Sequence, residues 1–110
     1  MIVDRNGNTT IITQENATVK TLVQNIEQAY DSYKNEHLVV NLSSLDKITS
    51  EEIIEFLRLS KTHRGAKKSF VLVSNKVDLV NMPDEIIVVP TIQEAFDIIE
   101  MEDIDGEKHF

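Results

Sequence analysis

The chain has 110 residues, of which 41% are hydrophobic and 27% are charged, and it contains no cysteine. This length suits a single domain with one core, and the lack of cysteine excludes disulfides and thiolate metal ligands. A net charge of −8 argues against general nucleic-acid binding, because that binding depends on lysine and arginine. No stretch approaches the roughly 18 apolar residues of a membrane span, and the first residues lack a signal-peptide pattern. We therefore expect a cytoplasmic protein without membrane segment, cofactor or metal.

The charges are unevenly distributed along the chain. Residues 58–68 hold five of the eleven basic residues and no acid, whereas residues 84–107 hold nine of the nineteen acids and no base. Runs of this kind are usually solvated surface. They can also orient a charged partner, and the sequence leaves both explanations open.

The first third of the chain predicts a hairpin followed by a helix. β-branched runs at residues 1–5 and 8–13 flank Asn6-Gly7, and this dipeptide favours a tight hairpin turn. From residue 16 to residue 36 the apolar side chains recur three and four positions apart, which predicts an amphipathic helix. Thr18 is its expected N-cap.

The remaining elements alternate between strands and helices. Apolar runs without alternation at residues 37–42, 69–74 and 85–89 are typical of strands buried on both faces, with helices on both sides of the sheet. A capping box of Thr49 and Glu52 should open a helix, which we expect to end at Gly65 as its C′ residue. Thr91 should cap the last helix.

The predicted order is β-β-α-β-α-β-(α)-β-α, with a short helical turn in parentheses. This order predicts an α/β sandwich with a mixed, mostly parallel sheet and right-handed crossovers. The domain is expected to cover residues 1–101. Residues 102–110 are polar and acidic, without apolar periodicity beyond Ile104, and predict a disordered C-terminal tail.

Two segments resemble a known family. Residues 38–53, LVVNLSSLDKITSEEI, are similar to the strand, loop and helix start of STAS domains, and residues 88–96, VVPTIQEAF, are similar to the last strand and helix of that family. STAS domains include bacterial anti-sigma factor antagonists and the cytoplasmic tails of sulfate transporters. The resemblance implies the STAS sandwich fold. It also implies a non-catalytic, regulatory protein-binding role, with a partner such as an anti-sigma factor or its kinase.

The chain departs from the family at the regulated position. The resemblance places Thr49 at the family's aspartate, Ser50 at its first serine, Glu51 at its phosphorylated serine and Glu52 at its glycine. Glu51 thus carries one permanent charge where a phosphate would add nearly two. Acids in a first helical turn are also ordinary, because they favour the helix dipole. Ser50 remains a candidate phosphosite.

We predict that this region contacts a protein partner, which the acidic surface suggests carries a basic patch. The candidate contact residues lie in the loop and first helical turns: Ser44, Asp46, Thr49, Ser50, Glu51 and Glu55.

Two alternatives remain open. Asn75-Lys76-Val77-Asp78 follows a predicted strand and matches the guanine-reading motif of GTPases, which makes Asn75, Lys76 and Asp78 candidate nucleotide-binding residues. The phosphate-binding loop that should accompany this motif is absent, because only three glycines are present. The chain also resembles short acidic proteins sometimes labelled ribonuclease Z. It lacks that enzyme's metal-binding histidine cluster, so this label suggests an accessory partner of ribonuclease Z.

His63 is expected to be solvated, because it lies near the C-terminus of a predicted helix.

Overall fold

The computed structural model describes residues 1–15, 18–45, 48–76 and 83–107, with side chains as far as Glu102. Five strands and five helices lie within these residues. The strands are β1 (Ile2–Asn6), β2 (Thr9–Thr13), β3 (His37–Asn41), β4 (Phe70–Val73) and β5 (Ile87–Val89). The helices are α1 (Val19–Gln28), the 3-10 helix η1 (Tyr30–Ser32), α2 (Ser50–Ile54), α3 (Leu57–Gly65) and α4 (Ile92–Glu107).

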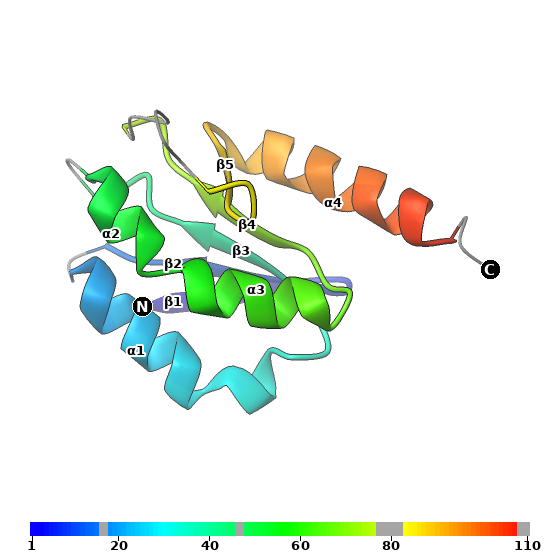
Figure 1. Ribbon diagram of the computed structural model, residues 1–110, viewed down its shortest axis with the longest axis horizontal. Helices are drawn as coiled ribbons and strands as arrows, with labels where there is room; N and C mark the ends of the chain where they lie inside the picture. The colour runs from blue at the N-terminus through cyan, green and yellow to red at the C-terminus, as the bar shows by residue number, and fades with distance from the viewer. Residues whose placement is uncertain (16–17, 46–47, 77–82, 108–110) are drawn as a thin grey trace.

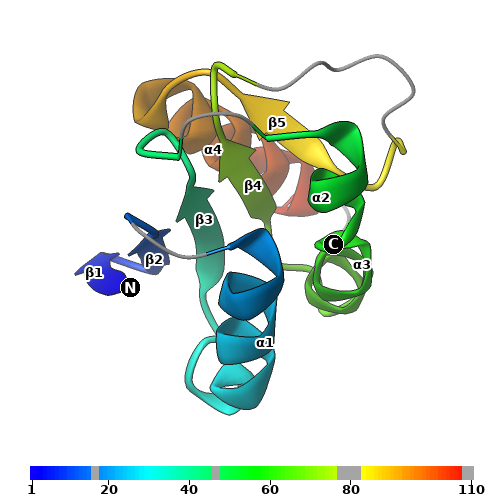
Figure 2. The same cartoon turned by 90° about the vertical axis from the view of Figure 1, so that its left-hand side faces the viewer.

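The strands form one mixed sheet in the order β1-β2-β3-β4-β5. β1 is antiparallel to β2, and all other neighbours are parallel. Because successive parallel strands are added in one direction, crossovers of the same hand place their helices on the same face of the sheet. Figures 1 and 2 show α1, α2 and α3 on one face and α4 on the other. The predicted α/β class and mixed, mostly parallel sheet are confirmed.

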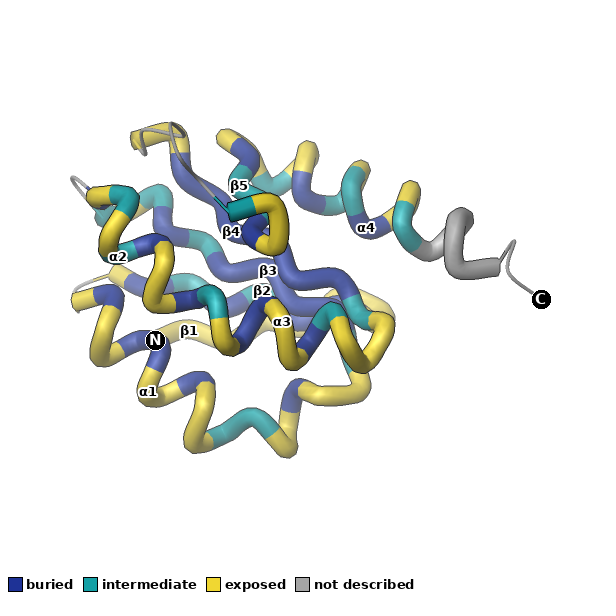
Figure 3. The backbone as a smooth tube through the Cα atoms, in the orientation of Figure 1, coloured by how far each residue is buried: buried dark blue, intermediate teal, exposed yellow. Residues whose placement is uncertain are grey.

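Alternate residues of the central strands supply two separate cores. All four residues of β4, and all of β3 except its last, are buried, and most of the length of both strands is accordingly dark blue in Figure 3. The core beneath α1, α2 and α3 receives from these strands Leu38, Val40, Phe70 and Leu72. The core beneath α4 receives Val39, Val71 and Val73. The continuous apolar runs therefore reflect two covered faces, as predicted.

Three predicted helix starts are confirmed by side-chain hydrogen bonds. The hydroxyl oxygens of Thr18, Thr49 and Thr91 each accept from a backbone N–H three residues later, at 3.2 Å in every case. At α2 the capping box is complete, because Glu52 Oε1 also accepts from the backbone N–H of Thr49. Short polar side chains before apolar periodicity thus locate these helix starts correctly.

The hairpin and the second helix differ from the prediction in detail. The hairpin turn is Gly7-Asn8, one residue later than expected, with Gly7 at φ +62°. The expected helix of residues 49–65 is divided after Ile54, where the backbone N–H groups of Glu55 and Phe56 donate to carbonyls three residues back. The buried side chains Ile53, Phe56 and Leu59 recur every three residues, and this tighter local winding keeps them on one face.

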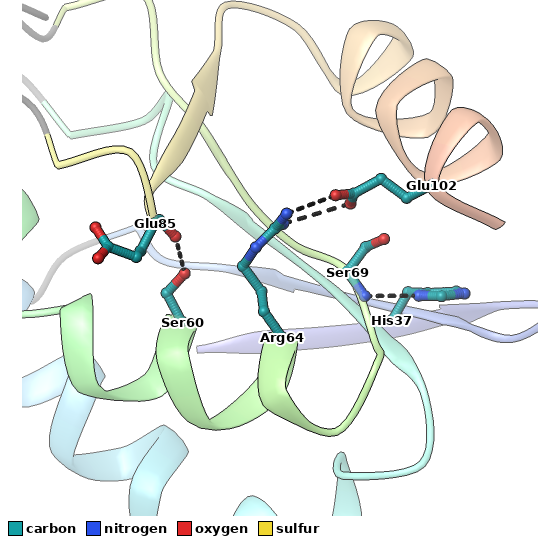
Figure 4. Close-up of polar contacts among 6 residues, drawn as sticks. All are labelled: His37, Ser60, Arg64, Ser69, Glu85 and Glu102. Carbon is teal, nitrogen blue, oxygen red and sulfur yellow. Dashed lines mark hydrogen bonds and ion pairs between the residues drawn. The ribbon is translucent and has the colours of Figure 1, made fainter. Parts of the chain in front are cut away.

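The last helix extends further than the sequence indicates. α4 runs to Glu107, past the expected end of the domain at residue 101 and into the segment predicted to be a tail. An ion pair of 2.6 Å joins Glu102 Oε2 to Arg64 Nη2 on α3 (Figure 4). Ser60, also on α3, donates to the carbonyl of Glu85 before β5. These contacts connect α3 with α4 and with the segment before β5.

The C-terminus of α3 differs from the prediction that Gly65 is the C′ residue. Gly65 is the last helical residue, and the left-handed position falls two residues later, at Lys67 with φ 64°. The backbone N–H of Lys67 donates to the carbonyl of Arg64, and that of Lys68 to the carbonyl of His63, which is the Schellman pattern. A lysine therefore occupies the position where glycine is usual.

Replacing Lys67 with glycine should stabilise the protein. We expect Lys67→Gly to raise the free energy of unfolding by about 0.5–1 kcal/mol, because relief of the left-handed conformation outweighs the added chain entropy. Urea denaturation provides the measurement. Lys68→Gly is the matched control: it adds the same entropy without relieving a positive φ, and should destabilise. A loss of stability in both variants would contradict the interpretation.

Candidate functional site

The loop that follows β3 begins with a side-chain turn. Asn41, the last residue of β3, directs Oδ1 at Ser43 and accepts from its backbone N–H at 3.0 Å and from its hydroxyl group. The backbone N–H of Leu45 then donates to the carbonyl of Leu42 at 3.0 Å. Asparagine at a strand end favours such a turn because its side chain substitutes for a backbone acceptor.

A lysine from the next strand end contacts the same loop. Lys76 Nζ lies 3.2 Å from the carbonyl oxygens of both Ser43 and Leu45. Parallel strands end at one edge of the sheet, so the segments that follow β3 and β4 are neighbours. The loop after β3 is thereby held from a second element.

The candidate contact residues divide into structural and exposed groups. Thr49 is exposed, but its hydroxyl caps α2. Ser50 is half-buried, whereas Ser44, Glu51 and Glu55 are exposed. Glu51 lies in the first turn of α2, and Glu55 directly follows the last residue of this helix. The sequence prediction thus identified an accessible pair of carboxylates on a helix start with a defined cap.

An apolar side chain and an open groove adjoin Glu55. Ile54 is 42% exposed. It lies on the wall of a groove of about 650 Å³ between α1 and the pair α2 and α3, whose apolar lining also includes Val23 and Leu57. Its charged lining consists of Lys20, Glu27, Glu55, Arg58 and Lys61. The one signal for this groove in the sequence is the polar outer face of the first predicted helix. The sequence does not indicate that α2 and α3 lie beside that face.

The structure describes only two of the three candidate nucleotide-binding residues, Asn75 and Lys76. Asn75 is exposed, and the ammonium group of Lys76 is hydrogen-bonded to the two loop carbonyls. Asp78 lies outside the described residues, as does Asp46 of the candidate partner surface. Nucleotide binding stays a prediction.

His63 is buried rather than solvated, contrary to expectation. Its side chain is fully enclosed, with Nε2 at 2.6 Å from the carbonyl of Glu36 and Nδ1 at 2.7 Å from the hydroxyl of Tyr30. The carbonyl can only accept, so Nε2 carries the proton, and in the neutral ring Nδ1 accepts from Tyr30. This network joins α3 to η1 and to the chain before β3.

Burial lowers the pKa of the His63 imidazole. The nearby charges of His37 and Lys68 act in the same direction, while the hydrogen bond to Glu36 opposes them. Desolvation disfavours the charged ring, and the buried network is therefore a structural element that depends on a neutral histidine.

Comparison with known proteins adds no family to this geometry. No family model matches the chain, and no curated protein matches it. Within the described part of the chain, no helix is long and apolar enough to cross a membrane. The same residues contain no group of three or more His, Cys, Asp or Glu side chains placed to hold a metal ion.

Acidification should weaken the fold through His63. Its folded pKa lies below the unfolded value of about 6.5, so below pH 6.5 the unfolded state binds more protons. The contribution of His63 to the free energy of unfolding should be constant above pH 7. It should decrease as the pH drops below 6.5 towards the folded pKa. Urea midpoints measured from pH 7.5 to 5.5 test this. His63→Gln should lower the urea midpoint but make it depend less on pH. An equal pH dependence in both proteins would contradict the assignment of this effect to His63.

Calorimetry can test the nucleotide alternative directly. Because Lys76 Nζ already donates to two carbonyls, we expect no saturable heat when GTP or GDP is added at millimolar concentration. A saturable heat that disappears in Asp78→Ala would contradict this expectation and favour a nucleotide sensor.

Proposed function

We propose that the protein is a non-catalytic regulatory protein of the STAS type, which binds another protein through the loop after β3 and the first turns of α2. The observation that carries the proposal is the exposed pair Glu51 and Glu55 on a helix start whose cap is complete. The sequence resemblance at residues 38–53 suggests the kind of protein, and the α/β sandwich is compatible with it.

The rigidity of this surface supports recognition rather than chemistry. The Ser43 hydroxyl is used in the turn at Asn41, and the Thr49 hydroxyl is used in the cap with Glu52. Side chains with these partners hold the backbone in place. A surface that is ordered before binding loses less conformational entropy when a partner docks.

The surface also has the composition of an interface. Exposed Ile54 lies beside Glu55 at the groove, so an apolar centre is bordered by charged groups, as is common where proteins meet. The two carboxylates would attract a basic patch and orient it before contact. The partner, an anti-sigma factor or its kinase under this proposal, is therefore expected to present lysine or arginine opposite Glu51 and Glu55.

At the family's phosphoserine position Glu51 supplies a charge that cannot be removed. A phosphate there would switch a partner on or off, whereas a carboxylate holds one state. The protein is accordingly proposed to act as a binding module without the usual switch at this residue.

Site-specific cross-linking tests the proposed surface. A photo-reactive residue in place of Glu51 should capture one protein in cells, whereas the same residue in place of Glu94 should not. Glu94 is exposed in the first turn of α4, three residues after the cap Thr91. Like Glu51 it is an exposed acid in a capped first turn, but it lies on the other face of the sheet.

The captured protein then allows affinity to be measured. Glu51→Lys should weaken binding by about tenfold or more through charge reversal, with an unchanged melting temperature, and Glu94→Lys should leave binding intact. Equal capture from positions 51 and 94, or loss of folding in Glu51→Lys, would contradict the proposal.

A further inference from the structure

The Asn-Lys-x-Asp stretch has a structural contact that its resemblance to a nucleotide motif does not explain. Lys76 Nζ donates to the carbonyl oxygens of Ser43 and Leu45, both at 3.2 Å. These carbonyls lie beyond the end of β3, where no neighbouring strand continues the ladder. A cation shared by two carbonyls forms charge-assisted hydrogen bonds, which are stronger than neutral ones.

The lysine is itself positioned by the buried end of β4. Its backbone N–H donates to Ser74 Oγ at 3.2 Å, and Ser74 is only 5% exposed. The backbone N–H of Ser74 in turn donates to the carbonyl of Val89 in β5. The ammonium group therefore projects from a chain segment that is hydrogen-bonded to the sheet.

The other contacts of the loop lie near its base. The backbone N–H of Leu42 donates to the carbonyl of Val73 at 2.8 Å, and Asn41 binds Ser43. Only Lys76, among the described contacts, reaches the carbonyl of Leu45 from another part of the chain. Leu45 is the last described residue before Ile48 and the cap of α2.

We propose that Lys76 is a positioning residue that fixes residues 43–45 after β3 in their binding conformation, so that these residues and Asn75-Lys76 form one protein-binding surface. This inference rests on the proposed function for its biological meaning. It assigns Asn75-Lys76 to the partner surface, beside Ser44, and not to a nucleotide site.

Amide hydrogen exchange on the free protein tests the first part. The amides of Ser43 and Leu45 are hydrogen-bonded within the loop, so their exchange rates report its opening. Lys76→Met keeps the aliphatic stem but removes the donors, and should speed exchange at both amides by about fivefold, as the loss of a modest hydrogen bond would. Lys76→Arg should restore protection because a guanidinium can donate to two carbonyls.

Lys61→Met is the matched control, since Lys61 is an exposed lysine on α3. Its exchange at Ser43 and Leu45 should equal that of the wild type. Unchanged exchange in Lys76→Met, or equal acceleration in Lys61→Met, would overturn the positioning role.

Cross-linking from position 51 tests the second part. In Lys76→Met the capture of the partner should fall severalfold and return in Lys76→Arg. Faster exchange with undiminished capture would overturn the link between the loop and binding. If the unaltered protein captures nothing, the proposed function fails, while the exchange data still decide whether Lys76 holds the loop.

Discussion

The structure depends on two central strands whose side chains are apolar on both faces. β3 and β4 send alternate residues into two cores, and neither face can be left in water without losing the burial that drives folding. α1, α2 and α3 cover one face and α4 covers the other (Figures 1 and 2). Polar segments are consequently confined to the ends of the strands, and the exposed carboxylates of α2 lie just beyond the carboxyl ends.

Polar side chains join the covering helices to one another and to the segments that flank the strands. The buried ring of His63 connects α3 with η1 and the chain before β3. Arg64 reaches around the sheet to Glu102 on α4, and Ser60 binds the segment before the short strand β5 (Figure 4). α3 is therefore fixed along most of its length, and it forms one wall of the groove beside Ile54.

Under the proposed function, the protein acts through a backbone that is held in one conformation and not through reactive side chains. Threonine, asparagine and lysine side chains are used to define the loop after β3 and the start of α2, and the carboxylates of Glu51 and Glu55 are left accessible. Under the proposed function, Glu51 would give such a binding module a fixed negative charge. The basic run of residues 58–68 is partly neutralised in the fold, because Arg58 and Arg64 pair with Glu27 and Glu102.

The amino-acid sequence by itself determined the strands, the three threonine caps and the exposed acidic helix start. These features follow from periodicity and from hydrogen bonds that span only a few residues. It did not reveal that His63 is buried, that Lys67 takes the left-handed position, that α4 continues past residue 101, or that Lys76 binds the loop after β3. Those outcomes were decided only by the tertiary structure, because each depends on which distant segments the sheet and its covering helices bring together.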